Sequence, residues 1–64
     1  MASSSERMRE LRGNKSQAQV AEALGIPAST YASYEQGKRE PKDSMKRKIA
    51  DYYKRSVQFI FFSD

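Results

Sequence analysis

One segment in the first half of the chain constrains the fold most, because it carries start and stop signals for a short helix. Ser16 can accept a hydrogen bond from the backbone of Gln19, whose side chain can reach back to Ser16 in a capping box. Gly25 suits a backbone of positive φ, and Ile26 can then fold back on the apolar face. The pattern predicts a helix that stops at Leu24.

A second helix can begin directly after this turn. Pro27 tolerates the first helical position because its missing N–H would have no partner there. Gly37 can end the helix after Gln36. At helical spacing, Tyr31 and Tyr34 face the first helix. The side chains left on the outer face are small: Ala28, Ser29, Ala32 and Ser33.

Upstream of this pair, the chain predicts one further helix. Ser4 or Ser5 can cap it, and it runs to about Arg12, with Gly13 near its end. Met8 and Leu11 are its expected core residues. Before this helix, the small polar residues 1–5 are expected to form a flexible arm.

Two more helices are predicted downstream. One begins near Asp43, after the helix-excluding Pro41. Its expected inward residues are Met45, Ile49, Tyr52 and Tyr53. Its expected outer, solvated face holds Lys46, Arg47, Lys48 and Asp51. Ser56 can cap a last short helix over residues 57–61. The residues expected to close the core there are Val57, Ile60 and Phe61. The whole pattern predicts an all-α fold of five helices.

Composition narrows the chemistry that the chain can perform. It has 64 residues with no Cys and no His, so we expect one domain over residues 1–64, without a disulfide or a metal site. No Gly-rich phosphate loop or supported carboxylate pair is present, so we expect neither an enzyme nor a cofactor. Twelve basic against eight acidic residues give a net charge of +4. This charge favours a polyanionic partner, although an inert basic surface fits it equally well.

The sequence predicts no membrane segment. The longest apolar run covers residues 59–62, which is too short to span a bilayer. Residues 1–10 lack the basic start and apolar stretch of a signal peptide. A soluble, cytoplasmic protein is therefore expected. A cationic membrane-active peptide is disfavoured, because the basic and apolar residues are spread over several short helices.

From Ser16 the chain reads S-Q-x-x-V-A-x-x-L-G-I-x-x-S-T-Y-x-x-Y-E-x-G-K-R-x-P. This motif resembles the lambda-repressor-like domain of Cro/CI-type (Xre) regulators, and the likeness extends from about Arg7 to Phe61. The resemblance implies a five-helix domain with a helix-turn-helix over about residues 16–36. It also implies a transcriptional regulator that binds double-stranded DNA without a small-molecule substrate. A short repressor or Cro-like protein of a phage, prophage or mobile element is the expected kind.

The resemblance assigns roles to individual residues. The second helix of the motif enters the major groove. The residues implied to face the bases are Ala28, Ser29, Ala32 and Ser33. Gln17 is implied to contact phosphate and to brace that helix. Lys38 and Arg39 are implied to contact the DNA backbone, with a plain solvated loop as the alternative. Because the base-facing set lacks Arg, Lys, Asn and Gln, bidentate contacts worth about 1–3 kcal/mol each are missing and moderate specificity is expected.

Phe59 is the expected dimer contact, because relatives carry a large residue at its place in the last helix, and Phe62 is the next candidate. A homodimer on a near-palindromic operator would read two half-sites about 34 Å apart. Such a pair supplies affinity that one domain with small base-facing side chains lacks. The alternative function is a protein-interaction module, such as an antitoxin or antirepressor, that binds a protein through these exposed aromatic rings.

Three positions depart from the family pattern. Pro27 replaces the usual Ser or Thr cap, so the cap hydrogen bond is missing there. Glu10 stands where relatives often carry the basic partner of Glu35. The donors left for that carboxylate are Arg7, Arg9 or another basic residue, unless it stays solvated. Lys54 begins a Lys-Arg pair where relatives have Gly-Val. A left-handed Lys54 would cost about 1 kcal/mol, so a differently built turn is the alternative.

Overall fold

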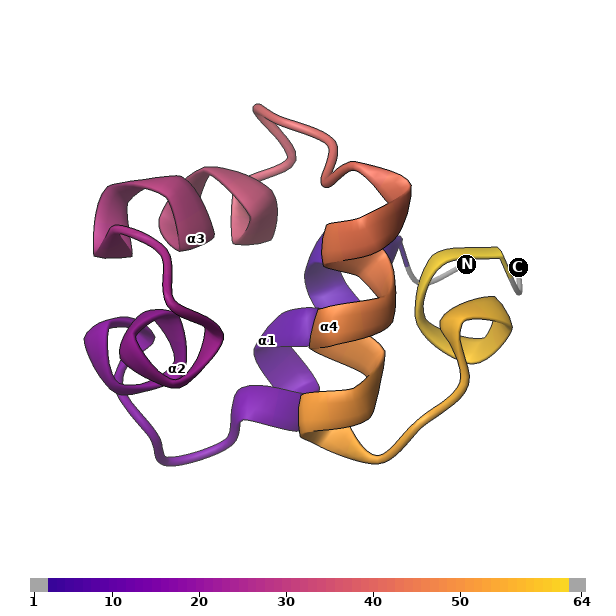
Figure 1. The fold of residues 1–64 in the computed structure, drawn as a ribbon, viewed down its shortest axis with the longest axis horizontal. Helices are drawn as coiled ribbons and strands as arrows, with labels where there is room; N and C mark the ends of the chain where they lie inside the picture. The colour runs from indigo at the N-terminus through magenta and orange to yellow at the C-terminus, as the bar shows by residue number, and fades with distance from the viewer. Residues whose placement is uncertain (1–2, 63–64) are drawn as a thin grey trace.

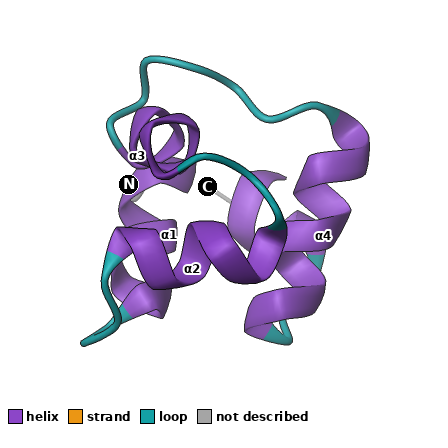
Figure 2. Cartoon of the chain, turned by 60° about the vertical axis from the view of Figure 1, so that its left-hand side comes forward, coloured by secondary structure: helices purple, strands orange, loops and turns teal. Residues whose placement is uncertain are grey.

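The structure is a computed structural model, and it describes residues 3–62. Its elements are α1 (Ser4–Arg12), α2 (Gln17–Leu24), α3 (Ala28–Glu35), α4 (Asp43–Tyr53) and a short π-helical turn, η1 (Gln58–Phe62). No strand occurs over this range, which confirms the predicted all-α fold of five helices. In Figure 1, α2 and α3 lie on one side of α4 and η1 lies on the other. The α3–α4 loop arches over the molecule in Figure 2.

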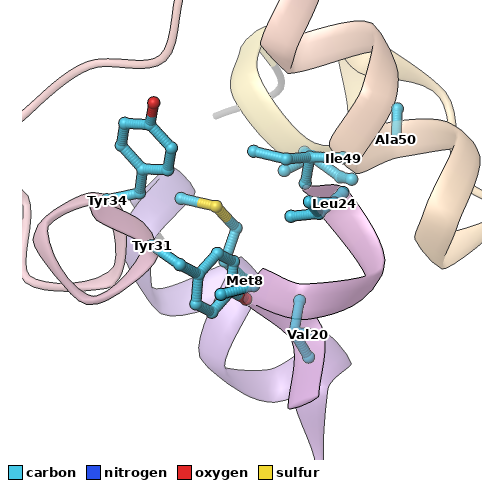
Figure 3. Close-up of a cluster of buried hydrophobic side chains, with 9 residues drawn as sticks. Met8, Val20, Leu24, Tyr31, Tyr34, Ile49 and Ala50 are labelled. Atoms are coloured by element: carbon cyan, nitrogen blue, oxygen red, sulfur yellow. The ribbon is translucent and has the colours of Figure 1, made fainter. Parts of the chain in front are cut away.

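The core lies where these elements meet, and every element contributes to it (Figure 3). Its buried residues are Met8, Val20, Ala21, Leu24, Tyr31, Tyr34, Ile49, Ala50 and Ile60. Around them pack the partly buried side chains of Leu11, Ile26, Met45, Tyr52, Tyr53, Val57 and Phe61. The inward faces predicted from helical spacing are therefore confirmed, and Ala50 joins them unpredicted.

The first helix begins earlier than predicted. Ser3 caps it: the Ser3 Oγ accepts from the Glu6 N–H at 3.2 Å, and the Glu6 carboxylate accepts from the Ser3 N–H at 3.5 Å. Ser4 and Ser5 belong to the helix, so the prediction that one of them is the cap is wrong. The same finding shortens the arm expected over residues 1–5, of which 1–2 lie outside the described residues.

The ends of α2 form as predicted. The Gln19 N–H donates to the Ser16 Oγ at 3.0 Å, and the Ser16 N–H donates to the Gln19 Oε1 at 2.9 Å. Gly25 adopts the left-handed conformation with φ 76°. The Ile26 N–H then donates to the Ala21 carbonyl at 3.0 Å, the six-to-one bond of a Schellman motif. The turn between α2 and α3 is thus fixed by local contacts.

The ends of α3 differ from the prediction by one residue each. Pro27, with φ −62° and ψ 147°, is the cap residue and not the first helical one, so α3 begins at Ala28. As the departure from the family pattern predicted, no side chain caps this end. The helix stops at Glu35 and not at Gln36, and Gly37 follows with φ 75°.

Beyond α3, the predicted start of α4 at Asp43 is confirmed, whereas the last helix is built differently. Lys54 ends α4 in the left-handed conformation, with φ 58°, so a lysine does take the place of the family's glycine. The Ser56 Oγ accepts from the Phe59 N–H at 3.0 Å, as expected of a cap. The turn that follows spans 58–62 with π-helical geometry, which corrects the predicted regular helix over 57–61.

Lys46 contradicts the solvated face predicted for α4. Its side chain is buried, with the residue 7% exposed, and the ammonium lies 3.1 Å from the Glu40 carboxylate. The Lys46 Nζ also lies 4.7 Å from the ring centroid of Phe62 and 5.6 Å from that of Phe61. The long stem of a lysine can cover apolar surface while its charge finds a partner, which explains the burial. Arg47, Lys48 and Asp51 are exposed as predicted.

Candidate nucleic-acid interface

The outer face of α3 carries the four residues predicted to face bases. Ala28 and Ser29 are exposed, and Ala32 and Ser33 are half-buried. These residues stand at positions i, i+1, i+4 and i+5 of the chain, so they share one side of the helix. Tyr31 and Tyr34, on the other side, pack into the core. The structure thus brings the four together on one surface. Their contact with bases stays a prediction.

The two serines of this face differ in hydrogen bonding. The Ser33 hydroxyl donates to the Ser29 carbonyl at 3.0 Å, a bond within the helix. Its oxygen lone pairs are left to accept from a base. The Ser29 hydroxyl makes no hydrogen bond with other residues of the 3–62 range, so it can act as donor or acceptor. Ser29 is the more versatile of the two.

A buried carboxylate anchors the opposite end of α3. Glu35 is 1% exposed; Arg12 Nε lies 2.7 Å from its Oε2, and Gln17 Nε2 donates to its Oε1 at 3.0 Å. The Arg9 guanidinium donates to the Glu35 backbone carbonyl. Three helices therefore converge on one residue.

Of the alternatives that the sequence left open for Glu35, the structure selects another donor, Arg12, and neither of the two arginines that were named. Arg12 pairs with the Glu35 carboxylate, whereas Arg7 donates to the Phe59 carbonyl. Sequence reasoning missed Arg12, although a signal was present: Arg12 lies four residues after Met8, on the inward stripe of α1.

The pKa values of this pair explain why it stays charged. Burial alone raises the pKa of Glu35, but the hydrogen bonds from Arg12 and Gln17, together with the positive charge of Arg12, outweigh it and hold that pKa below its ordinary value. The hydrogen bond to Glu35 raises the pKa of Arg12. Both groups are therefore ionised at neutral pH, and the carboxylate can keep its two donors.

A second polar contact joins α3 to α4. The hydroxyl oxygens of Tyr31 and Tyr53 lie 2.5 Å apart, and burial raises the pKa of both phenols. The two rings therefore stay neutral well into alkaline pH. The helix that carries the predicted base-facing residues is thus fixed to α1, α2 and α4.

Gln17 meets one of its two predicted roles. It lies at the start of α2 and braces α3 through the Glu35 carboxylate. That bond uses one amide hydrogen and leaves the other, together with the carbonyl oxygen, for a further partner. The half-buried amide can therefore still reach a phosphate, and this contact stays a prediction.

Lys38 and Arg39 follow α3 in a loop whose backbone is tied to that helix. The N–H groups of both residues donate to the Ser33 carbonyl, at 3.0 and 3.4 Å. Both side chains are exposed. The loop thus presents two exposed cations next to α3. If α3 entered the major groove of a DNA duplex, the phosphate backbone of that duplex would lie near this loop. Their contact with DNA remains untested.

The predicted dimer residues belong to η1, on the far side of α4 from α3 (Figure 1). Phe59 is 45% exposed and Phe62 is 60% exposed. The guanidinium groups of Arg7 and Arg55 lie 5.1 and 5.9 Å from the Phe59 ring centroid, within cation–π range. A contact there would leave the α3 face uncovered, and the dimer stays a prediction.

Other kinds of site find little support among residues 3–62. No group of three or more acidic, His or Cys side chains is arranged to hold a metal ion. Within the same range, no helix has the length and apolar character needed to cross a membrane.

Comparison with known proteins agrees with the geometry. Residues 6–60 match the model of the helix-turn-helix family HTH_3, a match that runs from α1 into η1. A comparison with curated proteins finds no match. The family match covers most of the chain and confirms the resemblance seen in the motif from Ser16. The chain therefore belongs to HTH_3, the Cro/CI-type family of DNA-binding helix-turn-helix regulators.

Proposed function

We propose that this protein is a sequence-specific transcriptional regulator that binds double-stranded DNA in the cytoplasm as a short repressor or Cro-like protein of a phage, prophage or mobile element. The observation that carries the proposal is the outer face of α3. Ala28 and Ser29 are exposed on it, while the buried Glu35 fixes the end of the same helix. A fixed helix with small outward side chains can approach base edges closely.

The chemistry of this face supports moderate specificity. Ala28 and Ala32 offer methyl groups to thymine methyls, and Ser29 can pair with most base edges. No side chain of the four forms a bidentate pair with guanine or adenine. Groove shape and bridging water would therefore carry much of the discrimination.

Phosphate contacts would supply most of the affinity. Gln17 at the start of α2 and the exposed side chains of Lys38 and Arg39 flank α3 on the chain. Cations that contact phosphates release counterions, so binding should weaken steeply with salt. For a bound dimer, the log–log slope of affinity against salt is expected on the order of −4 to −8.

Selection of sites from a random DNA pool, followed by gel shifts at two salt concentrations, tests this function. Lys38→Ala should weaken binding to all sequences about equally, whereas Ser29→Ala or Ser33→Ala should change the ranking of sites. Lys48→Ala, which removes an exposed charge from α4, is the matched control and should change little. A flat salt response would refute DNA binding, and a uniform loss in the two serine variants would refute the assigned recognition face.

The working unit we propose is a homodimer on a near-palindromic operator, with Phe59 at the contact and Phe62 as the next candidate. Their exposed rings support this choice, because two packed phenyl groups would remove apolar surface from water. Phe59→Ala should keep the helical spectrum and abolish cooperative binding to two half-sites, while single half-site binding is nearly unchanged. Unfolding of this variant would assign Phe59 to the core instead.

The same exposed rings favour a second candidate function, a protein-interaction module such as an antitoxin or antirepressor. Phe62 is the most exposed large apolar side chain in the described range. On this alternative, Phe62→Ala would abolish binding to a partner protein and the chain would bind random DNA weakly at every salt concentration. The gel shifts above therefore separate the two functions.

A further inference from the structure

Lys46 in α4 contacts two parts of the molecule to which the proposed function gives separate roles. Its side chain is buried, and its ammonium lies 3.1 Å from the carboxylate of Glu40, in the loop after α3. The same nitrogen lies 4.7 Å from the ring centroid of Phe62 in η1. Figure 1 shows η1 beside α4, on the side away from α3. One side chain therefore connects the loop with the turn.

On the loop side, the contact lies next to a proposed DNA contact. Glu40 directly follows Arg39, whose backbone N–H donates to the Ser33 carbonyl of α3 at 3.4 Å. Pro41 comes next and is buried, and a residue before proline is restricted to extended backbone. Because the backbone of Glu40 has little freedom to rotate, a displacement of Arg39 carries Glu40 with it. The position of the Lys46 ammonium therefore depends on the position of the loop.

Glu40 is the carboxylate that holds this ammonium. Asp43, in the first turn of α4, lines a cavity together with Lys46, but no ion pair joins these two residues within the described part of the chain. The Glu40 side chain is 71% exposed, so water screens its pair with Lys46 and the geometry of the pair can adjust. Lys46 can therefore follow the loop without leaving its partner.

On the side of η1, the contacted ring has room to move. Phe62 is largely exposed, and it lines a cavity of about 270 Å³ together with Asp43, Lys46, Arg47 and Val57. An ammonium attracts an aromatic face within about 6 Å of the ring centroid. Because the cavity leaves space beside the ring, this attraction sets where the exposed ring stands.

We propose that Lys46 is a positioning residue that couples the loop to η1, so that operator binding at the loop fixes Phe62 for a second copy of the chain. The inference rests on the proposed function, and it adds the residue through which the DNA contacts and the dimer contact act on each other. Phosphate contacts at Arg39 hold the loop, the loop holds Glu40, and Glu40 holds Lys46 at the ring. Coupling between two binding events is reciprocal, so the dimer also favours the DNA-bound position of the loop.

The first experiment tests the contact in the full chain without DNA. Glu40→Gln removes the charge that holds Lys46, so the NMR resonances of the Phe62 ring and of the Phe61 amide should shift. Lys46→Met keeps a long apolar stem and removes the ammonium. In a chain that carries Lys46→Met, the change at Glu40 should no longer reach Phe62. Glu22→Gln, at an exposed position of α2, is the matched control and should leave the resonances of η1 unchanged.

The second experiment compares binding to one half-site with binding to an operator of two half-sites. Lys46→Met should lower the cooperativity of two-half-site binding about fivefold, at the low end of usual coupling factors. Binding to a single half-site should stay nearly unchanged, because the variant alters none of the proposed DNA contacts. A merely structural loss would weaken binding to both kinds of DNA equally. Lys48→Met removes the same charge from an exposed position of α4 and should change neither quantity.

A combination of variants shows whether the two residues act through one contact. Glu40→Gln should lower the cooperativity as much as Lys46→Met does, and the double variant should lower it no further. Additive losses in the double variant would overturn the coupling. Should Lys46→Met fail to keep the helical spectrum, Glu40→Gln at its exposed position takes its place with the same expected loss.

The results separate this inference from the proposed function. If the chain binds no DNA, the proposed function fails and the coupling fails with it. If the chain binds two half-sites cooperatively and Lys46→Met keeps the full cooperativity, only the coupling is overturned. It is also overturned if Glu40→Gln leaves the Phe62 resonances where they are in the unmodified chain.

Discussion

The helix-turn-helix of α2 and α3 and the C-terminal pair of α4 and η1 are held in different ways. Both ends of α2 are satisfied locally, by the Ser16 capping box and by Gly25. In contrast, α4 begins without a side-chain cap at Lys42 and ends on a left-handed Lys54. In the half that carries the predicted recognition surface, α2 is thus fixed at both ends by local contacts, although α3 begins without a side-chain cap at Pro27. The other half depends on burial, chiefly of Ile49 and Ile60.

The two halves also differ in how they use buried charge. Glu35 is bound by two side chains from other helices, so its position fixes α3 against α1 and α2. Lys46 has one carboxylate partner, Glu40, which is itself largely exposed, and its other contacts are aromatic rings. The first arrangement is directional, and the second tolerates movement. We therefore expect the first half to respond more sharply to polar substitutions.

Glu35→Ala should have the largest effect, because it leaves Arg12 and Gln17 without their partner on α3. Breaking a buried ion pair costs about 3–5 kcal/mol, and we expect about 3 because Arg12 is partly exposed. A domain of this size has a free energy of unfolding of about 3–5 kcal/mol, so about 0–2 kcal/mol would remain and the variant should be destabilised to the point of partial unfolding, as measured by far-ultraviolet circular dichroism and urea unfolding. Glu22→Ala, on the exposed side of α2, is the control and should stay within about 0.5 kcal/mol.

Ile60→Ala should have the next largest effect and tests the C-terminal half. Its side chain is buried, and Ile→Ala substitutions in cores cost about 2–5 kcal/mol. We expect about 2 kcal/mol, because the short η1 turn can partly collapse into the space. Urea unfolding measures the change, with the exposed Gln58→Ala as control. A loss larger than that of Glu35→Ala would reverse the comparison of the two halves.

Acid should lower the free energy of unfolding by protonating Glu35. The loss should be smaller than in Glu35→Ala. The folded pKa of Glu35 lies below its ordinary value of 4.5, so the unfolded chain binds its proton first as pH falls. The stabilisation is complete above pH 4.5 and is lost as pH drops through the folded pKa. Urea midpoints measured over this range should fall, and Glu35→Gln should flatten the change. An equal acid slope in that variant would assign it to other carboxyl groups.

Most of the fold could be predicted because the decisive information is local. The Ser16 capping box and Gly25 act over a few residues, and the inward stripes follow from helical spacing. The Tyr31 and Tyr34 rings were predicted to face the first helix of the motif for this reason, and both are buried in the core. The end positions of α3 were each wrong by one residue, since Pro27 fits either the cap or the first helical position.

The anchor of the candidate site could not be derived from sequence, because it depends on contacts between distant residues. Which arginine reaches Glu35 is decided by how α1 packs on α3, and charge alone does not separate Arg12 from Arg9. The burial of Lys46 likewise follows from the placement of Phe61 and Phe62 over its stem. Sequence reasoning predicted the outer face of α3 and the brace from Gln17, but it did not name Arg12, the charged partner of Glu35.

A substitution in the turn after α4 should give the smallest change in the free energy of unfolding, and this change should be stabilising. Lys54 is exposed and adopts φ 58°, a conformation that costs a residue with a side chain about 1–2 kcal/mol relative to glycine. Glycine loses more backbone entropy on folding, which offsets part of the gain, so Lys54→Gly should raise the free energy of unfolding by about 0.5–1 kcal/mol. Lys48→Gly is the matched control: it makes the same replacement at an exposed position inside α4, where glycine should lower stability by about 1 kcal/mol. If urea unfolding shows that Lys54→Gly raises the free energy of unfolding and Lys48→Gly lowers it, the strain in the C-terminal half lies in this turn. Equal losses in the two variants would mean that the left-handed lysine carries no strain and that the half is limited by its packing.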